Sequence, residues 1–202
     1  MSSLHEFSGL VPIHFFALSC SIHYMQSESA KKGVFTKKYM LPSASLICSE
    51  ETLADVFVSW NEEGLFFLTT LLKKHSIKTI ELFIDTRDVK TSGYNTRFCH
   101  HFLYDFTEKE PVAREVTHFR GADKHTLIEE GFLFVKKLSS NDIHIIVSKD
   151  VLFGYEPMQF DRIGFSYRIS FETGAYQHFA ASSTDYKIEE EPSLWASCKL
   201  KK

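Results

Sequence analysis

Arginine and histidine recur at even spacing in two apolar segments of the chain. Arg97 and His101 lie four positions apart in one segment, and Arg162 and Arg168 lie six apart in the other, with only glycine and serine at the even positions between them. Residues two apart in an extended strand point to the same side of a sheet. Guanidinium groups bind carboxylate, phosphate and hydroxyl oxygens through paired hydrogen bonds. The spacing therefore predicts a cationic sheet face with room for a polar small ligand.

Four further residues complete the candidate set. Asp85 and Arg87 lie at the end of the predicted strand 77–85. Tyr94 and Tyr176 would supply an apolar wall beside a polar ligand. The candidate ligand-binding residues are Asp85, Arg87, Tyr94, Arg97, His101, Arg162, Arg168 and Tyr176. A second interpretation stays open, in which the arginines pair with Asp85, Asp88 and Asp161 in a solvated charge network of little energetic consequence.

Catalytic and metal-binding patterns are weaker. Cys99 and His101 share a face, but same-face neighbours along a strand lie about 6.5 to 7 Å apart, beyond the reach of a nucleophile and its base. His100 points to the apolar face and is predicted to be a core histidine, bonded to backbone or a tyrosine hydroxyl. A metal site built from Asp85, Asp88 and the two histidines matches no ligand spacing. The sequence also lacks the common nucleotide-binding, hydrolase and metalloprotease motifs. We therefore expect no catalytic residue, no metal and no cofactor.

Composition narrows the class of protein. The chain has 202 residues, is 44% hydrophobic and carries a net charge of -3, which predicts one globular domain over 1–202. A protein that binds nucleic acid through phosphate attraction would be basic. The early apolar stretch at 10–20 is too short for a membrane span and lacks the basic flank of a signal peptide. Four well-separated cysteines favour reduced thiols in a cytoplasmic protein, and two disulfides in an exported chain are the alternative.

The polarity pattern has a period of two in most segments, and turn residues bound those segments. Short strands at regular spacing are typical of an all-β, antiparallel β-sandwich, here jelly-roll-like with short helical turns. The predicted strands are 15–24, 54–60, 65–72, 77–85, 97–106, 113–120, 132–137, 142–148, 162–171 and 176–180.

The connections are predicted from glycine, proline and polar residues. Segments 61–64, 138–141 and 172–175 are expected to close hairpins. Segment 27–49 is expected to be a loop excursion with room for one short strand, and 182–202 a tail that packs on the sandwich. Residues 149–155 are expected to form a single helical turn that ends at a glycine.

Several blocks of the chain resemble one known family. Segment 54–65, with Trp60 before an acidic turn and a Gly-Leu pair, and segment 80–87 resemble the family 9 carbohydrate-binding-like domains, which are related to DOMON domains. Blocks 97–102 and 159–168 resemble an uncharacterised bacterial branch of that superfamily. The resemblance implies a jelly-roll-like β-sandwich whose relatives bind sugars or, in some DOMON members, haem. The tryptophan pair that clamps a terminal sugar in the family has no match here, and no motif supplies an axial haem ligand.

Together these features predict a non-enzymatic binding module for a polar small ligand, either a glycan or an anionic small molecule. The alternative is a protein-interaction or structural module that docks a partner chain on the same face or on an exposed phenylalanine-rich edge. Nucleic acid and membrane are not expected partners. The two readings differ in whether the polar sheet face is open or is covered by the 27–49 excursion and the tail.

Overall fold

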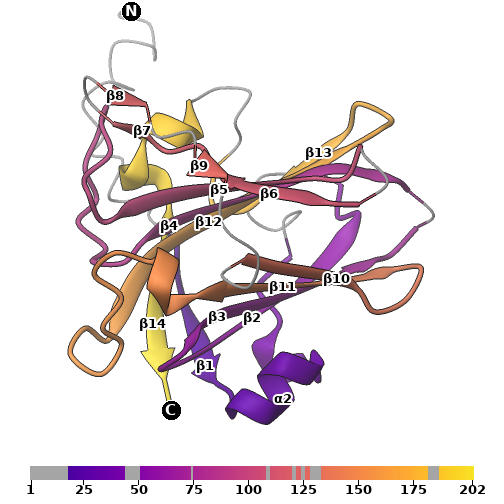
Figure 1. Ribbon diagram of the computed structural model, residues 1–202, viewed down its shortest axis with the longest axis horizontal. Coiled ribbons are helices and arrows are strands. Elements are labelled where there is room, and N and C mark those ends of the chain that lie inside the picture. Colours follow the sequence, from indigo (N-terminus) through magenta and orange to yellow (C-terminus); the bar gives the residue numbers. More distant parts are fainter. Residues whose placement is uncertain are drawn as a thin grey trace, which may run out of the picture.

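The computed structural model describes residues 18–43, 51–73, 75–107, 110–119, 122–123, 126–127, 133–181 and 187–202. One 12-stranded sheet dominates this part of the chain and folds over into two facing layers (Figure 1). The first layer contains, in order across the sheet, β10 (Leu133–Lys137), β11 (Asp142–Ser148), β3 (Gly64–Leu71), β2 (Ala54–Asn61) and β1 (Ser19–Tyr24).

The second layer continues from β1 through the last strand of the chain. Its order is β14 (Ala196–Lys201), β12 (Arg162–Phe171), β4 (Ile77–Asp85), β5 (Cys99–Asp105), β6 (Val112–Glu115) and β9 (Thr126–Leu127), and β13 (Tyr176–His178) pairs with β12 off this path. A separate two-stranded pair is made by β7 (His118–Phe119) and β8 (Ala122–Asp123). Figure 1 shows the two layers with β1 and β14 crossing one side.

The core lies between the layers and follows the predicted alternation. The inward residues of β12, which run from Ile163 to Phe171 at every second position, all belong to the main apolar cluster. Phe67 of β3 and Phe165 of β12 stack across the two layers with ring centroids 5.4 Å apart. Burial of such side chains is the main favourable contribution to folding. The all-β sandwich expected from the sequence is confirmed.

The predicted hairpins also form. Strands β2 and β3 pair through Asn61 and Gly64, β10 pairs with β11, and β12 pairs with β13, all antiparallel. The turn expected within 149–155 is the 3-10 helix η3 (Lys149–Val151), and Gly154 after it has a φ of 77°.

The excursion at 27–49 contains a helix where the sequence pattern predicted a loop with a short strand. Helix α2 (Ser27–Lys32) ends at Gly33, whose φ of 70° suits a helix terminus, and the short helix η2 (Lys37–Tyr39) follows. Ala30 is the buried residue of α2 and packs with Met25 and Phe66. Six residues are too few for a periodic pattern to be recognised. Residues 44–49 lie outside the described residues.

The C-terminal segment is a second correction. We expected 182–202 to be a tail, but it supplies β14, an interior strand that pairs with β1 in parallel and with β12 antiparallel. Ala196 and Cys198 face the core, and such small residues give a weak strand signal. Strand β1 also pairs in parallel with β2, so the sheet is not wholly antiparallel. Residues 15–17, 120, 132 and 182–186, also part of predicted segments, are not described.

Candidate functional site

The sheet face that the sequence predicted to be cationic is largely covered. We call the outer side of β4, β5 and β12 the covered face. There Phe83 and Cys99 pack against Ile188 and Trp195 in one buried cluster. These last two residues belong to the segment that contains helices η4 (Ile188–Glu190) and η5 (Pro192–Leu194). The Trp195 indole donates a 2.8 Å hydrogen bond to the Ile188 carbonyl, so the covering segment is held in a compact turn.

Two candidate residues on the covered face, His101 and Arg168, are bound to the same carboxylate. Arg168 donates to both oxygens of Glu81, from Nε at 2.8 Å and from Nη2 at 2.6 Å. His101 Nε2 lies 2.8 Å from Glu81 Oε2. Burial alone would raise the pKa of Glu81, but the hydrogen bonds from His101 and Arg168 outweigh it and lower the pKa from 4.5 to about 2. Glu81 and Arg168 therefore form an ion pair within the fold, and His101 is hydrogen-bonded to the same carboxylate.

Glu81 is a residue that the sequence analysis missed. It lies directly opposite Arg168 in the β4–β12 register. The available signal was a single carboxylate inside an otherwise apolar segment, since buried charged side chains are rare unless paired.

Arg162 lies at the other end of β12, away from this cluster. Its guanidinium is half-exposed and lies 3.6 Å from Asp161, as the solvated-network interpretation predicted. Arg168 lies six positions beyond Arg162 along the extended strand, which corresponds to roughly 20 Å. One small ligand therefore does not reach both.

Three candidates shape the loops after β4. The Asp85 carboxylate accepts backbone N–H bonds from Arg87 at 3.0 Å and Val89 at 2.7 Å, so it fixes a turn. The Arg87 guanidinium lies 3.5 Å from the centre of the Phe160 ring. Arg97 lies 5.0 Å from the centre of the Phe98 ring. Both contacts are cation–π interactions; the first joins two loops, and the second lies within one loop.

The two candidate tyrosines are exposed. Tyr94 lies in the loop after β4, where the Thr91 hydroxyl donates to its carbonyl. Tyr176 of β13 stacks with His178 at a centroid distance of 6.0 Å and lies opposite Ser170 of β12. The structure thus joins His101 and Arg168 through Glu81, but it does not gather all eight candidates into one pocket.

Two further titratable residues of β5, His100 and Cys99, are buried. His100 is a buried core histidine as predicted, but its partner is a carboxylate, Glu115 Oε1, at 3.0 Å. Burial raises the pKa of the Cys99 thiol to about 11, which keeps it protonated and poorly nucleophilic at neutral pH. Among the described residues, no group of three or more histidine, cysteine or acidic side chains is placed to hold a metal ion. No helix in the described ranges has the length and apolar character of a membrane span.

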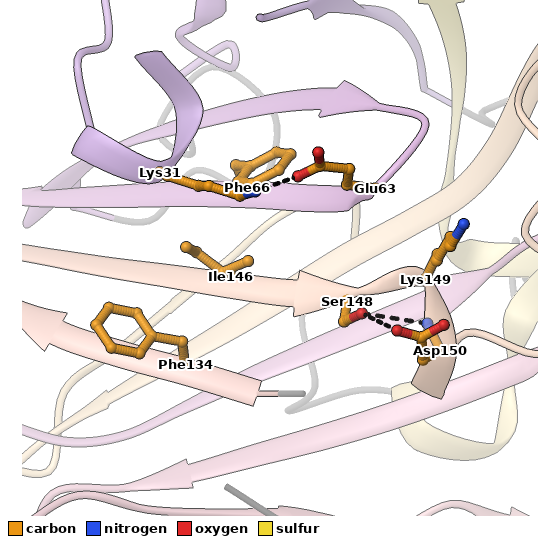
Figure 2. Close-up of a pocket in the computed structure, with 8 residues that line it drawn as sticks. All are labelled: Lys31, Glu63, Phe66, Phe134, Ile146, Ser148, Lys149 and Asp150. Atoms are coloured by element: carbon orange, nitrogen blue, oxygen red, sulfur yellow. Dashed lines mark hydrogen bonds and ion pairs between the residues drawn. The ribbon is translucent and has the colours of Figure 1, made fainter. Parts of the chain in front are cut away.

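An open pocket lies on the outer side of the first layer. We call it the outer-face pocket, and its volume is about 520 Å³. Its lining residues, shown in Figure 2, are Lys31, Glu63, Phe66, Phe134, Ile146, Ser148, Lys149 and Asp150.

The floor of this pocket is an apolar row across three strands. Phe134 of β10 is the register partner of Ile146 of β11, which in turn is the partner of Phe66 of β3. Helix α2 covers the Phe66 end of the row, where Phe66 packs with Ala30, and Phe134 is left 44% exposed. The row therefore begins under the helix and ends in an accessible aromatic ring.

The rim of the pocket is polar and balanced in charge. Lys31 and Glu63 form an ion pair at 2.7 Å above the apolar row (Figure 2). At one end, the Ser148 hydroxyl donates to Asp150 at 2.9 Å, and Lys149 extends beside them (Figure 2). The rim thus offers two ammonium groups, two carboxylates and one hydroxyl, which together can donate and accept hydrogen bonds.

The sequence analysis missed this pocket, although a signal was present. In the segments of β10 and β11, apolar residues fill consecutive positions, such as Phe134 with Val135 and Ile145 with Ile146. An alternating pattern needs only one apolar face, so consecutive apolar residues mark a strand that is apolar on both faces. The second face either packs beneath another element or binds a ligand.

Comparison with known proteins supports the architecture. No protein-family model matches the sequence, and no curated protein matches it. Among solved structures, the chain is similar to a family 9 carbohydrate binding module (CBM9) from Caldicellulosiruptor kristjanssonii in complex with cellotriose. The TM-score is 0.57 at 12% sequence identity, and the match covers 91% of this chain and 93% of that chain. The fold is therefore that of a carbohydrate-binding-module-like β-sandwich.

Proposed function

We propose that this chain is a non-enzymatic binding module for a neutral glycan, and that the glycan binds in the outer-face pocket. The observation that carries the proposal is the combination of an accessible aromatic ring, Phe134, at one end of the pocket with hydrogen-bonding groups elsewhere on its rim (Figure 2). Ligand pockets typically combine apolar walls with a few placed polar groups. A sugar ring matches this arrangement, since it has an apolar face and a hydroxyl edge.

The charge balance of the rim separates the two ligand classes expected from the sequence. Lys31 and Lys149 carry positive charge, while Glu63 and Asp150 carry negative charge. An anionic ligand would meet two carboxylates, and a like charge at close range costs binding free energy. On the covered face, the Arg168 guanidinium, which would also favour an anion, is bound to Glu81. The hydroxyl groups of a neutral polyol can donate hydrogen bonds to the carboxylates and accept them from the ammonium groups. The similarity in fold to a module that holds cellotriose supports this choice.

Titration calorimetry with cellotriose as the probe tests the proposal. We expect saturable binding to the wild-type chain. The Phe134→Ala variant should lose about tenfold in affinity, or ~1.4 kcal/mol, because the stacking ring is removed. Phe153→Ala is the matched control, because Phe153 is a 52% exposed phenylalanine in a loop outside the pocket. Absence of binding by the wild-type chain to cellotriose and to an array of neutral glycans would overturn the proposal, as would equal losses in both variants.

A second candidate function is binding of a protein partner at the loop end of the second layer. Val89, Phe153, Met158 and Phe160 are exposed there, and apolar side chains gathered at a surface are typical of interaction sites. In that case Phe153→Ala would weaken retention of the partner and Phe134→Ala would not. The same two variants therefore discriminate between the two functions.

Three further sequence predictions stand beside this proposal. They are a single domain over 1–202, a cytoplasmic location, and a relation to DOMON domains through an uncharacterised bacterial branch. The second rests on the spacing of the cysteines along the sequence, and the third on the sequence blocks 97–102 and 159–168.

A further inference from the structure

Two cysteines meet where the first described strand joins the last one. Cys20 of β1 and Cys198 of β14 are register partners in the parallel pair. Their Sγ atoms lie 3.1 Å apart, although the residues are 178 positions apart in sequence. Both thiols are free. Neighbouring strands lie about 4.8 Å apart, within the Cα separations of about 4.4 to 6.8 Å that disulfides span.

The two thiols differ in access and in acidity. Cys20 is partly exposed and Cys198 is fully buried. The hydrogen bond from Cys198 lowers the pKa of the Cys20 thiol, while burial raises the pKa of Cys198 well above its usual value. The thiolate is the form of cysteine that attacks an oxidant. Cys20 therefore has the properties of the attacking thiol, and Cys198 those of the thiol that completes the bond.

We propose that Cys20 and Cys198 form a reversible disulfide when the protein meets a two-electron oxidant of the peroxide class. The Cys20 thiolate attacks one peroxide oxygen, the O–O bond breaks, and Cys20 becomes a sulfenic acid. The Cys198 sulfur then attacks the Cys20 sulfur, the S–O bond breaks, and water leaves with the Cys198 proton. Overall the two thiols lose two electrons and two protons, and hydrogen peroxide becomes two water molecules. A dithiol reverses the bond by exchange.

The position of the pair gives the bond a structural effect. β1 connects the two layers, but only His23 and Tyr24 pair with β2, whereas residues 19–23 pair with β14. A Cys20–Cys198 bond would fix β1 to the second layer near the start of their ladder, at the end away from the β1–β2 pairing. It would also close a loop of most of the chain, which restricts the unfolded state. The oxidised protein should therefore be the more heat-stable form.

The test uses the full chain with Cys48→Ser and Cys99→Ser, so that only this pair remains. After treatment with hydrogen peroxide under native conditions, intact mass should fall by two hydrogen atoms and the titratable thiols should disappear. Non-reducing peptide mapping should recover the 20–198 link, and the melting temperature should rise and return after dithiothreitol. Adding Cys20→Ser supplies the control, in which peroxide should form no link and raise no melting temperature.

Two results would overturn the inference. One is that both thiols remain titratable in the folded protein after peroxide treatment, while they oxidise readily in urea. The other is that Cys20 gains oxygen and no crosslink forms. Neither result bears on glycan binding, because the outer-face pocket contains neither cysteine.

Discussion

Glu81 is the residue on which the charge balance of the covered face depends, because its one carboxylate accepts hydrogen bonds from Arg168 and His101. Replacing it by glutamine leaves the partly buried Arg168 guanidinium with only the more distant Glu189 carboxylate, at 3.8 Å, as a counter-charge. We expect Glu81→Gln to lower the free energy of unfolding at pH 7 by about 3 kcal/mol. The contribution of Glu81 is complete above pH 4.5 and is lost as the pH falls towards 2, because folding lowers its pKa from 4.5 to about 2. Urea unfolding at pH 7 and pH 3 measures both effects. A wild-type-to-variant difference that is equal at the two pH values would contradict the assignment.

His144 predicts a second pH dependence in a separate window. This buried histidine of β11 lies beside the Phe35 ring, and burial lowers its pKa from 6.5 to about 4. The unfolded chain takes up the proton first, so stability should fall as the pH drops from 6.5 towards 4. His144→Leu should flatten the stability curve in this window and leave unchanged the further fall in stability below pH 4, which Glu81 causes. Thermal unfolding in steps from pH 7 to pH 3 tests this, and an unaltered slope between pH 6.5 and 4 in the variant would refute it.

At the residue scale, the sequence was sufficient to predict which face of the sheet a side chain points to, but not which residue it binds there. The alternation of 162–171 correctly separated core residues from Arg168, because side-chain direction depends only on the local backbone. That Arg168 meets Glu81 depends on β4 lying next to β12, which no local pattern encodes. The same limit explains why His101 was predicted to bind a ligand and is instead bound to Glu81.

At the scale of elements, Gly64 fixes the β2–β3 hairpin against β11. Its φ is 150°, and a Cβ atom there would lie 2.1 Å from the Val147 carbonyl oxygen. Gly174, in the turn before β13, has a φ of 84° but no atom within 4 Å of its Cβ position. Gly174→Ala should therefore cost about 1 kcal/mol from backbone strain alone. Gly64→Ala should cost about 2–3 kcal/mol more, because the strand must also move.

Urea unfolding of both glycine variants measures the two losses of stability. Both positions have a positive φ, but only at Gly64 would the Cβ atom meet a neighbouring strand, so the difference between the losses reports the steric contact. Equal losses of stability would show that β11 does not pack against Gly64 as described.

The hairpins themselves were predictable from the sequence, because each is specified by two neighbouring segments and a short turn. Helix α2 and strand β14 were not, because each is six residues long and is stabilised by contacts with distant parts of the chain.

At the scale of the whole molecule, the two ends of the described chain lie side by side in the sheet. β14 joins β1 to β12 and so connects the two layers, as Figure 1 shows. Such long-range strand pairing cannot be predicted from the spacing of residues along the sequence. Closing so long a loop loses conformational entropy, and only the packing of the complete core compensates for that loss. The closure also explains why the face predicted to bind a ligand is covered: the chain must cross that face at 187–195 before it enters the sheet as β14.

Deleting residues 196–202 distinguishes an interior strand from a dispensable tail. The deletion would leave β1 and β12 without backbone hydrogen-bond partners on one side, and would remove Ala196, Cys198 and Leu200 from the core. We expect the shortened chain to lose its cooperative thermal transition and its native circular dichroism spectrum, because unpaired interior strands and an opened core exceed the few kcal/mol by which domains are stable. Deletion of Lys202 alone is the control, since that exposed residue contributes only an ion pair with Glu62 at 3.5 Å and a contact with the Tyr24 ring. If the 196–202 deletion kept a cooperative transition near that of the wild-type chain, β14 would not be an interior strand.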